Sequence, residues 1–298
     1  MKKIFLIFYG LGIFLFFGLS FLKSTELIDF SYIDGTGEIY KIYNTSSDSD
    51  TEIIERYSMY SNVSISTEQY LLLSCVNYSQ QDIAQYYDNL GNKRLDLNND
   101  SLINNNDNLD LVNGFCQPTA VAIALRYAYM WTDFDYDEDL DLNKNDINNV
   151  FYEVAQAYKY NGWTGGGFNR VNCKNCLNTI FSNNNNDFCA KYTTSQSTIY
   201  NQIVASYNQN FPIIAHITST NGACGHAVAV CGYRIINVNY YSGGTKHTEK
   251  IKYAIVNDTW YSSGMADGPG GISSNVFALN YSFIEMTDID AVTYVEEV

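Results

Sequence analysis

Few side chains in this sequence can act as a nucleophile or as a base near neutral pH. The chain of 298 residues contains seven cysteines and three histidines. An ordinary thiol has a pKa near 8.5, so only a few per cent of it is the reactive thiolate at neutral pH. A helix N-terminus and a neighbouring imidazolium both lower that pKa. Thiol chemistry therefore requires one cysteine at the start of a helix and one histidine that can face it.

Cys116 is the cysteine with this placement. It stands two residues before Pro118, which is tolerated only in the first turn of a helix, and an apolar stripe then predicts a helix from Pro118 to Trp131. The unpaired N–H groups of the first turn can also donate hydrogen bonds to an oxyanion. Of the seven cysteines, only Cys116 has such a position.

The partner base is one of three histidines. His226 is preferred because it begins the apolar pattern of Gly225 to Tyr233, where small residues leave space for a substrate and a facing thiol. His216 lies inside the apolar run 213–217 and can equally be a buried core residue. His247 follows the polar residues 242–246, and we expect it to be solvated in a turn.

A third group should orient the imidazole through its second nitrogen. The candidates are Asn257 and Asp258, at the end of the strand pattern 251–258. Consecutive strand residues point to opposite faces, so only one of the two can reach His226.

Taken together, three motifs resemble papain-like cysteine peptidases, and the residues around Cys116 are most similar to streptopain-like and bacteriocin-processing bacterial branches. The motifs are a cysteine at the start of a buried helix, a Gly-His strand and an Asn/Asp-x-Trp sequence ending the next strand. The resemblance covers roughly residues 110–285. In this chain the motifs read Gly114-Phe115-Cys116-Gln117-Pro118, Gly225-His226 and Asp258-Thr259-Trp260.

The resemblance implies roles for these residues. Cys116 is the nucleophile that forms a thioester acyl-enzyme, and His226 is the general acid/base. Asp258 is the orienting group, shielded by Trp260, with Asn257 as the alternative.

The chain departs from the papain-like pattern six residues before the nucleophile. There the family carries a glutamine that supplies an oxyanion donor, and this sequence has Asp110. Asn113, Gln81, Gln85 or backbone N–H groups alone are the possible substitutes. The oxyanion hole is therefore the part of the site that the sequence leaves open.

The function that follows is hydrolysis of peptide bonds by an exported cysteine peptidase. Two alternatives remain open. One is a cell-wall amidase or endopeptidase acting on peptidoglycan, and the other is a catalytically inactive surface binding homologue.

The remaining pattern predicts an α+β, papain-like fold, in which a helical part carrying the nucleophile packs on an antiparallel sheet. Apolar periodicity predicts a second helix from Asp146 to Gly162 and a third from Thr198 to Tyr207. Short β-type runs follow at Ile213–Ile217, His226–Ile236 and Ile251–Asp258.

The N-terminus carries two lysines, followed by an apolar run from Ile4 to Leu22, which is typical of an export signal. The run is also close to the length of a membrane-spanning helix. We expect residues 1–24 to be a signal peptide or membrane anchor, 25–95 an N-terminal region or pro-segment, and 96–298 the peptidase domain. The protein is then secreted or anchored on the outer face of the cytoplasmic membrane.

The charge excludes some classes of partner. With 17 Lys and Arg against 32 Asp and Glu, the net charge is −15, which argues against binding to nucleic acid or to an anionic membrane surface. We expect a monomer that acts on a peptide or protein substrate and contacts a membrane only through an N-terminal anchor.

No cofactor is expected, although two segments could bind a metal. Residues 96–107 place oxygen ligands at the spacing of an EF-hand-like calcium loop. Cys173, Cys176 and Cys189 fit either a local disulfide or part of a zinc site that lacks a clear fourth ligand. The pairing of these cysteines and of Cys224 stays open.

Overall fold

The computed structural model describes residues 32–33, 39–43, 46–71, 116–131, 147–162, 169–184, 188–209, 211, 213–220, 222, 225–257, 259 and 281–297. All of them belong to one compact unit, Ser31–Val298.

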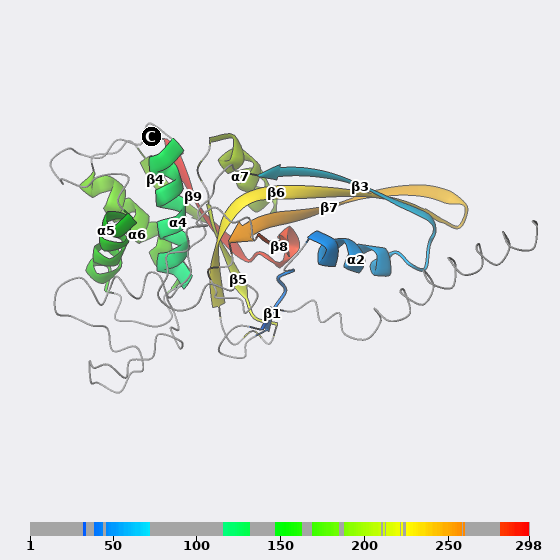
Figure 1. The fold of residues 1–298 in the computed structure, drawn as a ribbon, viewed down its shortest axis with the longest axis horizontal. Helices are drawn as coiled ribbons and strands as arrows, with labels where there is room; N and C mark the ends of the chain where they lie inside the picture. Colours follow the sequence, from blue (N-terminus) through cyan, green and yellow to red (C-terminus); the bar gives the residue numbers. More distant parts are fainter. Residues whose placement is uncertain are drawn as a thin grey trace, which may run out of the picture. The chain divides into compact units, whose positions relative to one another are not determined.

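A seven-stranded sheet occupies the centre of the described chain (Figure 1). The strand order is β4-β9-β5-β6-β7-β8, β3 pairs with β6 in addition, and every pairing is antiparallel. A separate two-stranded sheet joins β1 to β2. The strands are β1 (Tyr32–Ile33), β2 (Ile39–Tyr40), β3 (Ser61–Leu71), β4 (Phe188–Thr193), β5 (Ile213–Thr218), β6 (Gly225–Ser242), β7 (Thr245–Asn257), β8 (Ser282–Glu285) and β9 (Ala291–Glu297).

Helices pack on this sheet and divide the core into two clusters. One cluster joins α4, α5 and α6 to the sheet, and the other contains buried residues of α7. The fold is therefore α+β, as predicted, with the helix of Cys116 packed on an antiparallel sheet. The helices are α2 (Ser46–Arg56), α4 (Cys116–Trp131), α5 (Ile147–Tyr160), α6 (Arg170–Asn183), α7 (Gln196–Gln209) and a short 3-10 helix η3 (Met286–Asp288).

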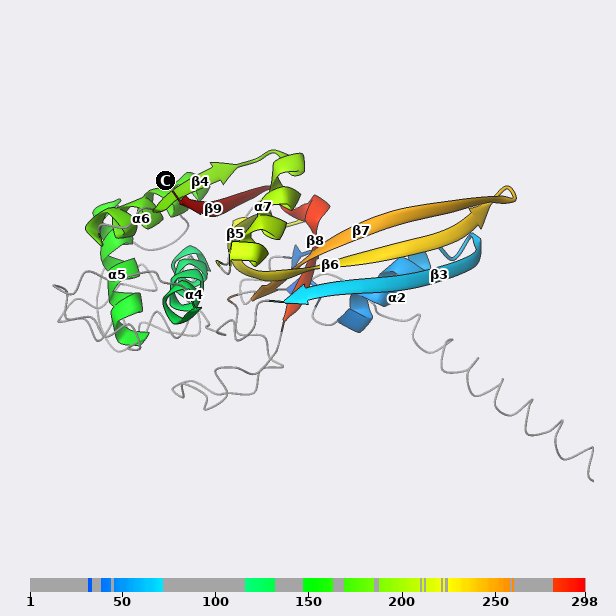
Figure 2. The same ribbon diagram turned by 90° about the horizontal axis from the view of Figure 1, so that it is seen from above.

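The long strand β6 connects the two halves of the sheet. Its first part, Gly225–Val230, pairs with β5, and its later part pairs with β3 (Figure 2). Gly232 lies where β3 comes closest: a Cβ atom there would sit 2.2 Å from the carbonyl oxygen of Tyr70. Only glycine permits this approach of the two backbones.

The N-terminal segment 42–71 contributes both a helix and a strand to this fold. Ile53 of α2 is fully buried, Tyr43 forms an isolated bridge with Phe283 of β8, and β3 is hydrogen-bonded to β6. Removal of residues 25–95 as a pro-segment stays a prediction, as do the domain boundaries. Such a cut would take one strand out of the main sheet.

The structure agrees with the predicted helices in 114–207 and extends some of the predicted elements. α4 begins at Cys116, two residues before the predicted start, and the predicted second and third helices correspond to α5 and α7. The sequence analysis missed α2, α6, η3, β1, β2, β3, β4, β8 and β9.

One local prediction was wrong. His247 lies in β7 opposite Tyr240 and not in a turn. The turn is shorter than predicted, because Gly243 and Gly244 have positive φ angles of 57° and 84° and close a two-residue hairpin. The flanking residues are polar on both faces of the hairpin, so no apolar alternation marked them as strand.

Among the helices in the described part of the chain, none is long and apolar enough to cross a membrane. Residues 1–24 lie outside that part.

Candidate active site

Cys116 is the first residue of α4, so the sequence prediction of a thiol at a helix start holds in the structure. Its side chain is half-buried and packs against the core cluster that contains Ala227 and Ala229 of β6. The first-turn N–H groups of a helix have no partner within the helix. The thiol therefore lies at the end of α4 where backbone donors and the positive end of the helix dipole are found.

His226 is the second residue of β6, and only 3% of it is exposed. It pairs across the sheet with Ile217 of β5. Helix α4 packs against both β5 and β6, and the two figures show it beside this end of the sheet (Figures 1 and 2). The fold thus brings the helix that starts at Cys116 against the strand that carries His226 as its second residue.

The end of β7 is fixed beside the start of β6. Asn257 pairs with Ala229, and its side-chain oxygen accepts a hydrogen bond from the backbone N–H of Thr259 at 2.9 Å. Thr259, whose φ is 63°, donates its hydroxyl to the carbonyl oxygen of Ala227 at 3.2 Å. These contacts hold the chain on both sides of position 258 close to the residue that follows His226.

Position 258 itself lies outside the described residues. The same is true of Trp260, of Asp110, and of the three candidate side-chain oxyanion donors Asn113, Gln81 and Gln85. Their roles remain predictions.

The structure places His216 in the core, which is one of the two interpretations that the sequence left open. It is 1% exposed, its Nε2 lies 3.0 Å from the hydroxyl of Thr293, and its ring contacts Tyr192. Burial, together with the nearby Arg170 charge, lowers the pKa of His216 to about 3. An imidazole with so low a pKa is a weak base, so the described geometry favours His226 over His216.

His247 is exposed, and its ring stacks on that of Tyr240 with centroids 5.2 Å apart. It belongs to the far part of the β6–β7 hairpin, whose residues Tyr241–Lys250 are all exposed. This surface location gives it no link to α4 in the described structure.

The cysteines of α6 differ from Cys116 in environment. Cys173 and Cys176 are fully buried thiols, and burial raises the pKa of Cys173 to about 12, with a smaller contribution from nearby Cys116. Burial also raises the pKa of Cys176. Both are therefore protonated near neutral pH and act as packing residues.

The disulfide and zinc interpretations of Cys173, Cys176 and Cys189 do not match this arrangement. All three are thiols, and Cys189 lies on β4, where its Sγ contacts the carbonyl oxygen of Ala190. Within the described ranges, no group of three or more His, Cys, Asp or Glu side chains is arranged to hold a metal ion. The proposed calcium loop at 96–107 and Cys224 lie outside those ranges.

One charged group beside Gly225, at the start of β6, was missed by the sequence analysis. Arg170, the first residue of α6, lies next to Gly225 and forms an ion pair of 3.1 Å with Asp290. The sequence feature that could have predicted α6 is Asn169, a typical N-cap residue, whose side chain accepts a hydrogen bond from the N–H of Val171. Recognising this cap would have predicted the helix, but not the position of Arg170 beside β6.

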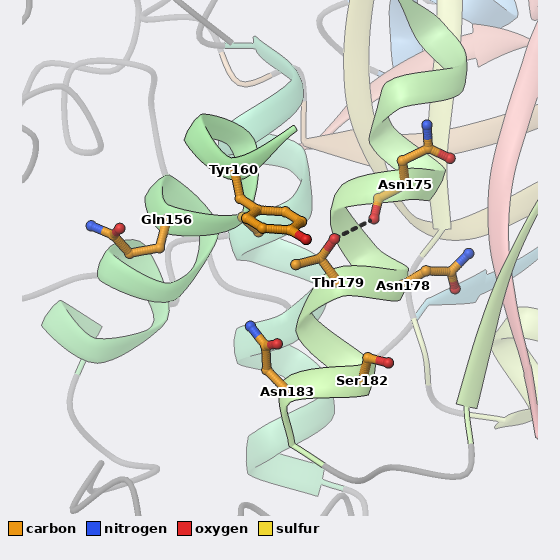
Figure 3. A pocket seen from close by; sticks show the side chains of 8 residues that line it. Gln156, Tyr160, Asn175, Asn178, Thr179, Ser182 and Asn183 are labelled. Atoms are coloured by element: carbon orange, nitrogen blue, oxygen red, sulfur yellow. Dashed lines mark hydrogen bonds between the residues drawn. The ribbon is translucent and has the colours of Figure 1, made fainter. Parts of the chain in front are cut away.

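A cavity of about 620 Å³ lies between α5 and α6, away from these residues (Figure 3). The ring of Tyr160 points across it towards Thr179, and the side chain of Tyr160 is 82% exposed. None of the candidate catalytic residues lines it. The lining residues are Gln156, Ala157, Tyr160, Asn175, Asn178, Thr179, Ser182 and Asn183.

Comparison with known proteins gives one match. The model of the Peptidase_C39 like family matches residues 97–281, a range that includes Cys116, His226 and position 258. No curated protein and no solved structure matches the chain significantly.

Proposed function

The chain belongs to the Peptidase_C39 like family, which is papain-like, and on this premise we propose that it cleaves peptide bonds with Cys116 as nucleophile and His226 as general acid/base. The family match supports a cysteine peptidase in general terms. The residue roles and the reaction steps are our proposal.

The observation that carries the proposal is the position of Cys116 at the first residue of α4, a helix that packs on β6, the strand that carries His226 as its second residue. A helix N-terminus stabilises a thiolate, and an adjacent imidazolium stabilises it further. Cys173 and Cys176 of this core are enclosed and protonated near neutral pH, and Cys231 is buried, whereas Cys116 is half-buried. Of the described cysteines, Cys116 is the one with both access and a supporting helix dipole.

In the proposed reaction, the Cys116 thiolate attacks the carbonyl carbon of the scissile peptide bond. The negative charge that develops on the carbonyl oxygen is stabilised by N–H groups at the start of α4. Pro118 supplies no donor, so these come from its neighbours in the first turn.

The protonated His226 then gives its proton to the leaving amine, and a thioester acyl-enzyme remains. Water attacks the thioester while His226 accepts a proton from it. The carboxylic acid product leaves, and the thiolate–imidazolium pair is restored.

We propose Asp258 as the group that orients His226. The support for Asp258 is its place in the sequence Asp258-Thr259-Trp260, which resembles the papain-like motif. Asn257, the alternative, is 3% exposed, and its side-chain oxygen accepts a hydrogen bond from the N–H of Thr259.

Export remains part of the proposal. Its support is the basic and apolar N-terminal sequence within residues 1–24. We propose a protein that is secreted or anchored on the outer face of the cytoplasmic membrane, acts on peptides or proteins, and needs no cofactor for the reaction described.

The deciding experiment combines thiol labelling with zymography. The protein and its Cys116→Ala and Cys189→Ala variants are treated with iodoacetamide between pH 5 and 9, and each is run on gels containing casein. We expect labelling at Cys116 well below pH 8 and a cleared casein band that is lost only in Cys116→Ala. Cys189 is the matched control because it is the other half-buried thiol among those described.

The same preparation distinguishes the alternatives. Clearing of a cell-wall gel without clearing of casein identifies a peptidoglycan amidase or endopeptidase. A Cys116 that labels only above pH 8, with no clearing of either gel, identifies an inactive binding homologue.

A further inference from the structure

The cavity between α5 and α6 is lined by uncharged polar groups (Figure 3). Its volume of about 620 Å³ is in the range of small-molecule sites. In the described structure its lining consists of four side-chain amides, a serine, a threonine, an alanine and a tyrosine. None of these residues is acidic, basic or a histidine, so a charged ligand would find no ion-pairing partner among them.

Hydrogen bonds hold the walls of this cavity in place. Asn161, which follows α5, donates to the hydroxyl of Thr179 at 3.0 Å, and Thr179 donates to the carbonyl oxygen of Asn175 at 3.0 Å. Asn178 joins α6 to β4, because its amide accepts from the N–H of Ala190 at 2.7 Å and donates to the carbonyl oxygen of Ala190 at 3.2 Å. A site whose walls are fixed in advance loses less conformational entropy when a ligand binds.

Other lining groups remain available to a ligand. The side-chain amides of Gln156, Asn175 and Asn183 have no hydrogen-bond partner in the part of the chain that the structure describes. Each amide can both donate and accept. The ring of Tyr160, which is 82% exposed, adds a flat apolar surface with a polar hydroxyl at its end.

We infer that this cavity is a binding site for an uncharged saccharide. The hydroxyl groups of a sugar ring donate and accept hydrogen bonds, as the free amides do, and the C–H groups on one face of the ring can pack on Tyr160. A peptide would need apolar pockets for its side chains, and the apolar lining here is limited to Ala157 and the Tyr160 ring. None of the lining residues is a candidate catalytic residue, so the inference is independent of the proposed function.

The test is isothermal titration calorimetry of the full chain with three trisaccharides: the N-acetylglucosamine trimer, cellotriose and maltotriose. We expect at least one of them to bind with a Kd of about 5 mM or tighter. Tyr160→Ala should weaken this binding about tenfold, because the stacking surface is lost, whereas Tyr160→Phe should keep it within about threefold. Asn175→Ala should weaken it about fivefold through the loss of a hydrogen bond.

Two control variants keep the cavity distinct from other parts of the molecule. Tyr241→Ala removes another exposed tyrosine, at the far end of β6, and should leave binding unchanged. Cys116→Ala should lose hydrolysis but bind the trisaccharide as the natural protein does, so the two proposals fail separately. Circular dichroism shows that each variant is folded.

Three results would overturn the inference. The first is a Kd weaker than about 5 mM for all three trisaccharides. The second is a loss of binding in Tyr160→Ala that is no greater than the loss in Tyr241→Ala, which would place the saccharide elsewhere. The third is tighter binding of the uncharged tripeptide Ala-Asn-Ala than of any trisaccharide, which would identify a peptide site.

Discussion

The guanidinium of Arg234 in β6 is almost completely buried and forms an ion pair of 2.9 Å with Asp50 in α2. A second donor of the same guanidinium reaches the hydroxyl of Ser49 at 2.9 Å. The Cζ atom of Arg234 lies 5.6 Å from the centre of the Phe283 ring. A buried cation depends on such partners, because it has left water. Helix α2 therefore contributes to the stability of the central sheet.

Replacing Asp50 with alanine should therefore destabilise the whole fold. We expect a loss of about 2 kcal/mol in the free energy of unfolding, between the values typical of exposed and of buried pairs, because Asp50 is partly exposed. Equilibrium unfolding in urea measures this change in the free energy of unfolding. Glu296→Ala, which breaks the exposed pair with Lys191, is the control and should change stability by less than about 0.5 kcal/mol. Equal effects of the two variants would mean that Arg234 does not need Asp50.

Gly232→Ala tests the close approach of β3 and β6. The added methyl would lie 2.2 Å from the carbonyl oxygen of Tyr70 and 2.9 Å from Cα of Leu71, so β3 must move away. We expect a loss of about 3 kcal/mol and faster amide hydrogen exchange along Ser61–Leu71. Gly243→Ala changes a turn with open space around it, although its positive φ makes alanine moderately unfavourable. Unchanged exchange along β3 in Gly232→Ala would show that β3 is not tightly paired in solution.

Cys116→Ala and His226→Ala should both abolish hydrolysis while leaving the protein folded. A loss of about 10⁴-fold or more in kcat is expected for residues that act as one unit. The double variant should be no worse than either single variant for the same reason. Circular dichroism and Tm show whether folding is preserved, and substantial turnover in either single variant would contradict the assignment.

Substitutions at 257 and 258 should affect different properties. Asn257→Ala removes the acceptor for the Thr259 N–H and should cost about 1 kcal/mol of stability, with less than about tenfold loss in kcat. Asp258→Ala should lower kcat by about 10²-fold or more, because the imidazole of His226 loses its orienting partner. The reverse order of the kcat effects would identify Asn257 as the orienting group.

Acid should destabilise the protein through His216. Its pKa is lowered to about 3 in the folded chain, chiefly by burial, against an ordinary value of 6.5 in the unfolded chain. Between these values the unfolded chain binds a proton that the folded chain does not, so stability falls as the pH drops below 6.5. At pH 5 the loss is about 2 kcal/mol relative to pH 7.

His216→Gln provides the comparison, since glutamine can still reach Thr293 but does not titrate. The difference in unfolding free energy between pH 7 and pH 5 should be about 2 kcal/mol smaller in the variant. Carboxyl groups titrate equally in both proteins and cancel in this difference. Parallel pH profiles for the two proteins would show that His216 is protonated while folded.

The sequence by itself determined the elements with strong local signals. Pro118 and the apolar stripe after it predicted the helix of Cys116, because proline fixes φ and is accepted only in the first turn. Small apolar residues after His226 predicted a buried strand. These local features also carried the resemblance to papain-like peptidases that the family match confirms.

Tertiary structure alone decided which remote groups meet. In β3 only Val63 and Ile65 alternate with polar residues before a polar stretch, so its pattern is a weak strand signal. The strand forms because β6 extends beyond β5 and Gly232 allows the two backbones to approach. Arg170 comes to lie beside Gly225 because α6 packs against the sheet. Local periodicity reports which face of an element is buried, whereas the partner on that face depends on contacts between distant parts of the chain.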